Sequence, residues 1–188
     1  MQRPTYLPKS SLPQGGVLKA HRPVVKSRKG VVACAHYAAS MAGAQMFFKG
    51  GNAVDAVVAA AAALNVVEPY MSGLGGVGFL VISRNYGESR EVLNFSGIVP
   101  QKAVPGAFAA ETHSVGTRSP IVPGNPAGWL AVLEAYGTLS GSEVLEPAID
   151  LAEQGYVVSE LDGRFFKVNF EKLSKFNFDV DSKFSKFL

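Results

Sequence analysis

The sequence predicts a mixed α/β (α+β) domain, in which helices pack against a short antiparallel sheet. Three observations predict this class. Small apolar residues recur at helical spacing between residues 31 and 49. A second run, residues 53–65, is apolar on nearly every side, which is typical of a buried helix. Two short apolar segments, 79–83 and 91–95, are separated by turn residues and predict a hairpin.

Composition excludes several other classes. Hydrophobic residues make up 47% of the 188 residues, which argues against disorder. The 18 basic and 15 acidic residues form no dense basic block, so we expect no nucleic-acid partner. The single cysteine, Cys34, cannot form an internal disulfide. No histidine or cysteine spacing is typical of a metal site, and we predict no metal and no cofactor.

The chain shows no apolar leader at its start, and its longest apolar run is too short to span a bilayer. We therefore expect no membrane span and favour a cytoplasmic location. Residues 1–30 combine prolines, glycines and scattered charge, which predicts an N-terminal arm. Residues 31–188 form the predicted domain.

The first helices have clear expected ends. Lys49 and the glycine pair that follows predict the end of the helix that begins near residue 31. Asn52 is then the expected N-cap of the second helix, and Asp55, three residues on, suits a capping-box acid.

The second half of the chain predicts further helices. Asn125, followed by a proline, is the expected N-cap of a helix that Gly137 stops. Residues 147–154 predict another short helix, closed by Gly155, and a further helix is expected from Ser159. Residues 101–122 are expected to be loop with short helical pieces.

A glycine-rich loop lies between the buried helix and the hairpin. Residues 73–78 satisfy the pattern G-x-G-x-x-G, but a dinucleotide site needs a strand before the loop and a helix after it. The predicted order is the reverse, so we exclude nucleotide binding. The glycines suit close backbone approach. Glu68 just before the loop is a candidate catalytic carboxylate, although an acceptor for loop amides is the favoured interpretation.

Two further sets of residues are candidates for chemistry. Cys34 and His36 would suit a nucleophile and its base. Residues two apart on a helix face different ways, so a core cysteine and a histidine on a polar face are favoured. The segment 94–100 leaves the second predicted strand toward a loop, where ligand contacts are common.

Four motifs in order resemble the γ-glutamyltransferase (γ-glutamyltranspeptidase, glutathione hydrolase) family. The resemblance runs from about Val31 to Glu160, and no single motif would suffice. The motifs are Lys49-Gly-Gly-Asn-Ala-Val-Asp55, Val67-Glu-Pro-Tyr-Met-Ser-Gly-Leu-Gly-Gly-Val-Gly-Phe79, Pro123-Gly-Asn-Pro-Ala-Gly-Trp129 and Glu146-Pro-Ala-Ile-Asp-Leu-Ala-Glu-Gln-Gly155.

The resemblance implies an N-terminal-nucleophile hydrolase fold, a four-layer α/β/β/α sandwich, present here in part. It also implies a precursor that cleaves itself into a large and a small subunit. A threonine newly exposed at the start of the small subunit attacks the substrate amide, its own α-amine acting as base. A γ-glutamyl group, usually from glutathione, then passes to water or to an amino acid, without a cofactor.

The match covers the early part of the large subunit, so the expected partner is the small-subunit segment. Neither Thr112 nor Thr117 sits in a context that matches the nucleophile. We therefore predict no catalytic residue in this chain and expect it to be inactive alone. The predicted substrate-binding residues are Asn94, Phe95 and Ser96.

One departure bears on the substrate. The family commonly places an arginine in the stretch that aligns with residues 95–100, where it pairs with the α-carboxylate of the glutamyl group. This chain has no arginine there, and Ser96 offers a neutral hydrogen bond worth about 1 kcal/mol. An acylase on non-glutamyl amides is therefore an open alternative. A truncated, non-catalytic paralogue is a second alternative, because the nucleophile motif of the small subunit is not matched.

Overall fold

The computed structural model describes residues 24–104 and 121–174. These residues form helices and one antiparallel pair of strands, which confirms the predicted mixed α/β class. The elements in chain order are α1 Tyr37–Phe48, α2 Ala53–Val67, β1 Gly78–Arg84, the 3₁₀ turn η2 Asn85–Gly87, β2 Ser89–Phe95, α3 Asn125–Tyr136, α4 Gly141–Gln154 and α5 Glu160–Ser174.

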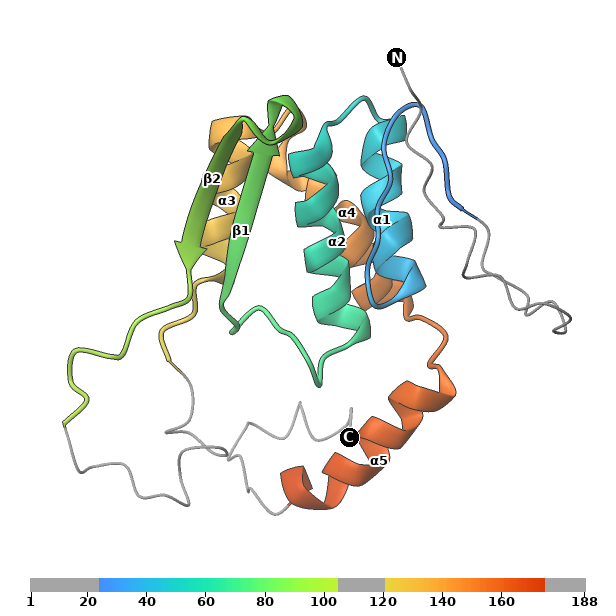
Figure 1. Cartoon of the computed structure of the whole chain (residues 1–188). Helices are drawn as coiled ribbons and strands as arrows, with labels where there is room; N and C mark the ends of the chain where they lie inside the picture. The colour runs from blue at the N-terminus through green and yellow to red at the C-terminus, as the bar shows by residue number, and fades with distance from the viewer. Residues whose placement is uncertain (1–23, 105–120, 175–188) are drawn as a thin grey trace, which may run out of the picture.

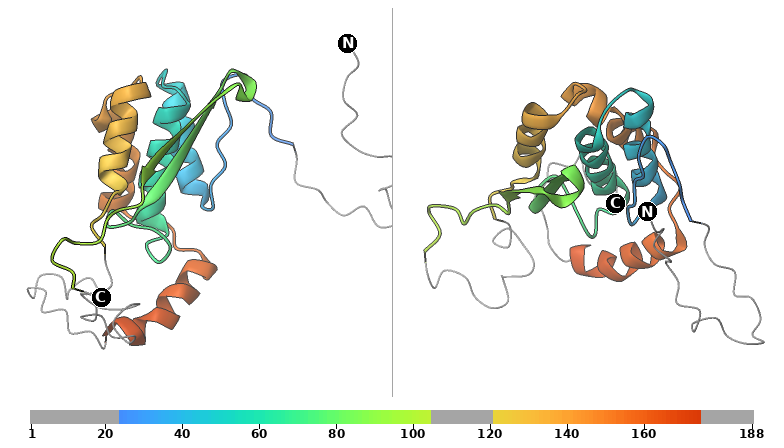
Figure 2. Two further views of the ribbon diagram at one scale, coloured as in Figure 1. Left: turned by 60° about the vertical axis from the view of Figure 1, so that its left-hand side comes forward. Right: turned by 45° about the horizontal axis from the view of Figure 1, so that its top comes forward.

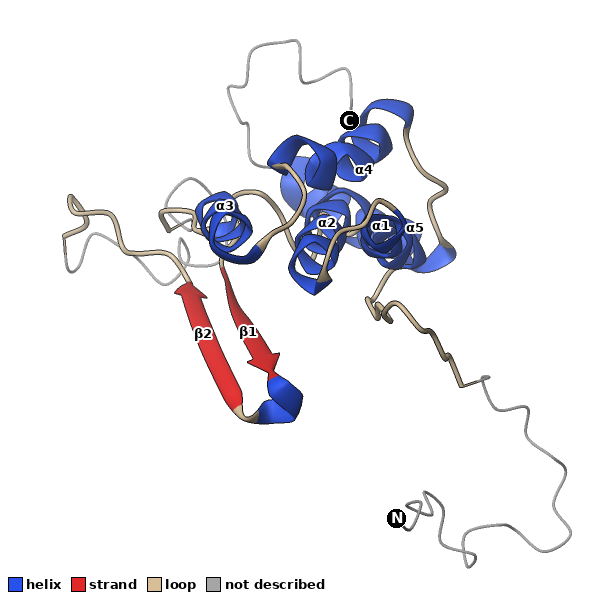
Figure 3. Cartoon of the chain, turned by 90° about the horizontal axis from the view of Figure 1, so that it is seen from above, coloured by secondary structure: helices blue, strands red, loops and turns tan. Residues whose placement is uncertain are grey.

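The helices surround α2. Helices α1, α2 and α3 lie in a row, with α4 on one face of the row and the hairpin on the other (Figures 1 and 3). Helix α2 packs along both α1 and α4, and β2 packs on α3. Helix α5 lies beyond the end of α2, apart from this bundle, in both views of Figure 2.

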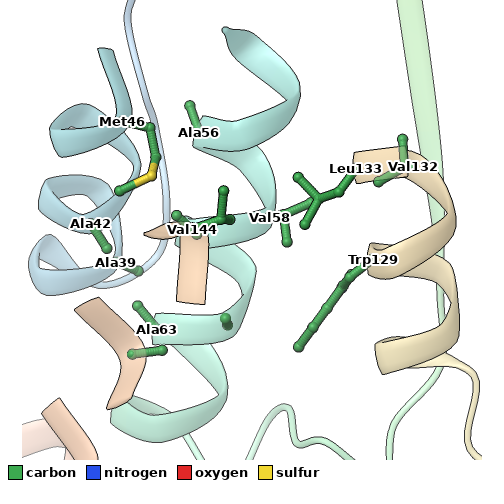
Figure 4. Close-up of a cluster of buried hydrophobic side chains, with 13 residues drawn as sticks. Ala39, Ala42, Met46, Ala56, Val58, Ala63, Trp129, Val132, Leu133 and Val144 are labelled. Atoms are coloured by element: carbon green, nitrogen blue, oxygen red, sulfur yellow. The ribbon is translucent and has the colours of Figure 1, made fainter. Parts of the chain in front are cut away.

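Small side chains bring α1 and α2 together. Ala39, Ala42 and Met46 of α1 are almost fully buried and turn toward α2 (Figure 4). A Cβ atom added at Gly43 would lie 2.7 Å from the carbonyl oxygen of Ala56, so only glycine permits this approach. The predicted small-residue face of the first helix is therefore its packing face.

Helix α2 is the centre of the core, as its all-round apolar composition predicted. Val58 and Ala59 are at most 1% exposed. Trp129 reaches toward α2 from α3, and Val144 contributes from α4 (Figure 4). The helix runs on to Val67, past the end expected near residue 65.

A capping box opens α2, as predicted. The Asn52 side chain accepts from the amides of Val54 and Asp55, and the Asp55 carboxylate accepts from the Asn52 amide at 2.7 Å. Asp55 has a second function that the sequence did not predict. It is fully buried and also accepts from the amides of Thr138 and Leu139 between α3 and α4.

The predicted starts of α1 and α4 were wrong. Helix α1 begins at Tyr37, not near residue 31, because the side chain of His36 caps it. Helix α4 begins at Gly141, not at Pro147, because Ser140 and Glu143 form a capping box ahead of it. The proline lies inside the helix and is buried against its neighbours.

The predicted ends of α1, α3 and α4 agree with the structure. Helix α1 ends before Lys49, and Gly50 has a positive φ. Gly137 follows α3, and Gly155, also with a positive φ, closes α4. The helix expected from Ser159 is α5.

The predicted hairpin is present and slightly longer than expected. Its strands are antiparallel, with Gly78 opposite Phe95 and Arg84 opposite Ser89. Alternate residues face the helices, including Leu80, Ile82 and Leu93. The opposite face is open: Phe79, Val81 and Val92 are 64–66% exposed.

Some expectations concern residues outside the described ranges. Residues 105–120, most of the expected loop of 101–122, are among them. Residues 24–30, at the end of the predicted arm, form neither helix nor strand. Among the described helices, none has both the length and the apolar character needed to cross a lipid bilayer.

Candidate functional site

A depression of about 320 Å³ lies where β2 leaves the sheet. Two segments distant in sequence form it: the end of β2 with the residues that follow, and the segment that leads into α3. The lining residues are Asn94, Phe95, Ser96, Gly97, Ile98, Val122, Pro123, Gly124 and Ala127.

Glycines allow these two segments to meet backbone to backbone. Gly97 has φ +81°, and a Cβ there would lie 2.5 Å from the Val122 carbonyl oxygen. A Cβ at Gly124 would lie 2.0 Å from the Phe95 carbonyl oxygen. The Val122 amide donates to the Ile98 carbonyl at 3.0 Å. The shape of the depression therefore depends on both glycines.

The glycine-rich loop is held against the same place. The amides of Gly124 and Asn125 both donate to the Gly76 carbonyl at 3.1 Å, and the Asn125 side-chain amide donates to the Gly73 carbonyl at 2.9 Å. The prediction of Asn125 as N-cap was wrong. Gly124 occupies that position, because the asparagine side chain is used to hold the loop.

The order of the elements on either side of the glycine-rich loop is the predicted one. Helix α2 precedes it and strand β1 follows it, the reverse of a dinucleotide fingerprint.

The contacts of Glu68 differ from those predicted for its carboxylate. The amides of Met71 and Ser72 donate to its main-chain carbonyl, at 3.0 and 3.1 Å, so the backbone and not the carboxylate closes this turn.

The three predicted substrate-binding residues all line the depression. The Asn94 side chain is exposed, and its oxygen accepts from the Ser96 amide at 2.9 Å. Phe95 points inward, and a Cβ at Gly128 would lie 2.3 Å from its ring. Phe95 is thus part of the packing beneath the depression, whereas Asn94 and Ser96 supply its neutral polar groups. Their binding of substrate stays a prediction.

The two arginines of the sheet lie at its other end. Arg84 and Arg90 flank the hairpin turn, whereas the depression adjoins the pair Gly78 and Phe95. The Arg84 guanidinium binds Glu91 and lies over the Tyr136 ring, 4.8 Å from its centroid.

Glu91 completes this arrangement at the far end of the sheet. The hydrogen bond from Tyr136, with a second one from Arg84, lowers the pKa of Glu91. The bond to Glu91 raises the pKa of Tyr136. This cluster therefore stays paired at neutral pH, at the end of the sheet away from the depression.

Cys34 and His36 do not form a nucleophile pair in a helix, because both precede α1. Cys34 is half-buried against the core, in line with the favoured interpretation. The expectation of a histidine on a polar face was wrong: His36 is 6% exposed, and its Nδ1 accepts from the Ala38 amide at 3.1 Å.

Sequence reasoning missed a buried polar cluster near α5. His36 lies 3.9 Å from Asp162, and the Tyr70 hydroxyl donates to Asp162 at 2.6 Å. The spacing of Ser159 and Asp162, a hydroxyl three residues before an acid, was the available signal for a cap at this position. In the ranges 24–104 and 121–174, no group of three histidine, cysteine or acidic residues could hold a metal.

Comparison with known proteins gives consistent results. The sequence profile of the Gamma-glutamyltranspeptidase family matches residues 39–187. A glutathione hydrolase-like proenzyme of Bacillus subtilis is 39% identical over 157 residues, which cover 81% of this chain and 30% of the relative. An acylase proenzyme of a Pseudomonas strain, ACY 1, is 39% identical over 151 residues, which cover 73% of this chain and 27% of that protein.

A solved structure has a similar fold over most of this chain. The crystal structure of γ-glutamyltranspeptidase from Helicobacter pylori matches with a TM-score of 0.78 and 34% identity, over 82% of this chain and 46% of that one. This likeness confirms the predicted fold class: the helices and the antiparallel pair are part of an N-terminal-nucleophile hydrolase fold. The chain spans about 30% of the length of the curated relatives it matches.

Proposed function

This chain belongs to the γ-glutamyltranspeptidase family, and we propose that its depression at the end of β2 forms one wall of an amide-substrate pocket. The reaction proposed for the whole enzyme is transfer of a γ-glutamyl group from glutathione or a related amide to water or an amino acid. The observation that carries the proposal is the convergence of Asn94, Ser96 and the segment before α3 on one depression.

In this proposal the attacking group lies outside residues 1–188. A threonine hydroxyl of the small-subunit segment would add to the amide carbonyl, form an ester and release the amine after proton transfer. Water or an acceptor amine would then attack the ester and free the threonine. The described residues bind and orient the acyl group beside this centre, so they affect substrate affinity more than the bond-breaking step.

The neutral polar lining favours a second candidate. Ser96 and Asn94 offer hydrogen bonds but no charge, and residues 95–100 contain no arginine for an α-carboxylate. A bidentate arginine would hold that carboxylate more strongly than one hydroxyl does. Hydrolysis of non-glutamyl amides is therefore the alternative activity, and the similarity to an acylase proenzyme supports it.

Three chromogenic amides separate the two activities in the complete protein: the γ-glutamyl, glutaryl and butyryl p-nitroanilides. The γ-glutamyl proposal predicts the highest kcat/KM for the first. Faster hydrolysis of the glutaryl amide would instead mean that the α-amine is not recognised. Preference for the butyryl amide would mean that a neutral acyl group is bound, and either result would replace the transferase proposal with the acylase.

A matched pair of variants tests the depression itself. In the complete protein, Ser96→Ala removes one neutral hydrogen bond, so KM for the preferred amide should rise about two- to tenfold with kcat nearly unchanged. Ser83→Ala is the control, because that serine is exposed at the far end of β1. Equal effects of the two substitutions would remove Ser96 from the proposed site.

A further inference from the structure

A buried polar cluster connects α5 to the turn that leads into the glycine-rich loop. Asp162 of α5 is 2% exposed, and His36, the N-cap of α1, is 6% exposed. Tyr70, in the turn after α2, reaches the same place. Buried acids and histidines need partners, so the contacts of this cluster bear directly on how α5 is held.

The two carboxylate oxygens of Asp162 accept hydrogen bonds from different parts of the chain. One carboxylate oxygen accepts from the Ser159 amide at 2.9 Å, and the Asp162 amide donates to the Ser159 hydroxyl at 3.2 Å, which caps α5. The other oxygen accepts from the Tyr70 hydroxyl at 2.6 Å. A single side chain therefore fixes both the start of α5 and the position of Tyr70.

The protonation states of Tyr70 and Asp162 favour the hydrogen bond between them. The hydrogen bond to Asp162, together with burial, raises the pKa of Tyr70 to about 12. The bonds from Ser159 and Tyr70 lower the pKa of Asp162. At neutral pH the tyrosine is thus protonated and the aspartate is ionised, which gives a charge-assisted hydrogen bond.

Aromatic packing and His36 surround the bond. The Tyr70 ring stacks on Phe165 of α5, with centroids 4.5 Å apart. The Nδ1 atom of His36 accepts from Ala38, so in the neutral ring the proton lies on Nε2. That nitrogen is buried without a hydrogen-bond partner in the described residues and faces Asp162 at 3.9 Å. The carboxylate that this nitrogen faces is the one that binds Tyr70.

The glycine-rich loop lies between the Tyr70–Asp162 hydrogen bond and the depression. Tyr70 is part of the turn closed on the Glu68 carbonyl, and Gly73 follows directly. The Asn125 side chain holds the start of the loop at Gly73, the backbone amides of Gly124 and Asn125 hold it at Gly76, and Gly124 lines the depression. A shift of Tyr70 would therefore pass along a short, hydrogen-bonded path to the proposed pocket wall.

We propose that Asp162 is a positioning residue, which fixes the glycine-rich loop through Tyr70 and so couples the placement of α5 to substrate affinity. The inference rests on the proposed function of the depression. Asp162 itself lies on α5, outside the lining of the depression, and acts only through Tyr70. A purely structural aspartate would change stability but not the affinity for substrate.

Tyr70→Phe in the complete protein is the direct test, because it removes the hydroxyl and keeps the stacked ring. Because the turn before the glycine-rich loop then lacks its hydrogen bond to Asp162, KM for the preferred p-nitroanilide should rise about threefold or more. The change in kcat should stay below about twofold. Asp162→Asn keeps an oxygen that can accept from Tyr70, so its rise in KM should be smaller. Arg164→Ala is the control: it breaks an exposed ion pair with Glu160 on the same helix and should leave KM unchanged.

The outcomes are distinct. A lowered melting temperature with unchanged KM in Tyr70→Phe would reduce the cluster to a structural role and overturn the proposal. An equal rise in KM for Arg164→Ala would also overturn it, because any disturbance of α5 would then suffice. If Ser96→Ala raises KM and Tyr70→Phe does not, the proposed pocket stands and only the coupling to α5 fails.

Discussion

The α1–α2–α4 bundle and the β1–β2 hairpin differ in how completely they bury their apolar residues. In the bundle, Met46, Ala59 and Val144 have no exposed surface. In the hairpin, one face packs on the helices, whereas Phe79 and Val81 on the other face are 66% and 64% exposed. The bundle thus buries completely the apolar side chains at its centre. The hairpin has an apolar face still open to a further layer, as expected for part of a four-layer sandwich.

The largest effect should come from a cavity in the bundle. Met46→Ala removes a fully buried side chain between α1 and α2 and should lower the free energy of unfolding by about 2–5 kcal/mol. Val81→Ala lies on the face that a further layer is expected to cover in the complete protein, and it should lower this free energy by less, about 1–2 kcal/mol, because it removes only two methyl groups. Chemical unfolding of the complete protein measures both. A loss below about 0.5 kcal/mol for Val81→Ala would mean that this face stays exposed in the complete protein, which would contradict the expected further layer.

A smaller effect is expected where the bundle meets α3. Asp55→Asn places an amide group opposite backbone amides that now donate to the carboxylate, including those of Asn52 and Thr138. The free energy of unfolding should fall by about 1–3 kcal/mol. Asp150→Asn is the control, since that residue is exposed on α4. Equal losses for both variants would contradict a special role for the buried carboxylate.

The smallest effect is a dependence on pH. Because the pKa of Asp162 is lowered in the folded protein, its stabilisation is complete above the ordinary aspartate pKa of about 4 and is lost as pH falls through the lowered pKa. The difference in melting temperature between the native protein and Asp162→Asn should therefore shrink as pH falls below about 4. Glu91 and Glu143, whose pKa values are also lowered, contribute equally to both proteins. A constant difference would contradict the assignment.

Local signals explain which parts of the fold could be predicted. The Asn52 capping box, the all-apolar α2 and the glycine after α4 each depend on neighbouring residues, and the structure confirms all three. The start of α4 was missed although it is also local. Pro147 suggested a first turn, whereas the capping box at Ser140 starts the helix two turns earlier.

The site depends on contacts between distant residues, and this limits prediction. Asn125 resembles an N-cap in sequence, yet its side chain is bound to Gly73, which lies 52 positions away. Tyr70 and Asp162 are 92 positions apart. No pattern along the chain indicates such pairs, because packing brings them together. The end of β2 was predicted as the substrate wall from its position alone, and its role in binding stays a prediction.

The central claim is that these residues form a pocket wall while the attacking hydroxyl lies elsewhere in the complete protein. Trapping the acyl-enzyme from the preferred p-nitroanilide by acid quench, followed by peptide mapping, tests it most directly. We expect the acyl group to be attached to a threonine outside residues 1–188. An acyl group on Cys34, or on any serine or threonine within residues 1–188, would contradict it.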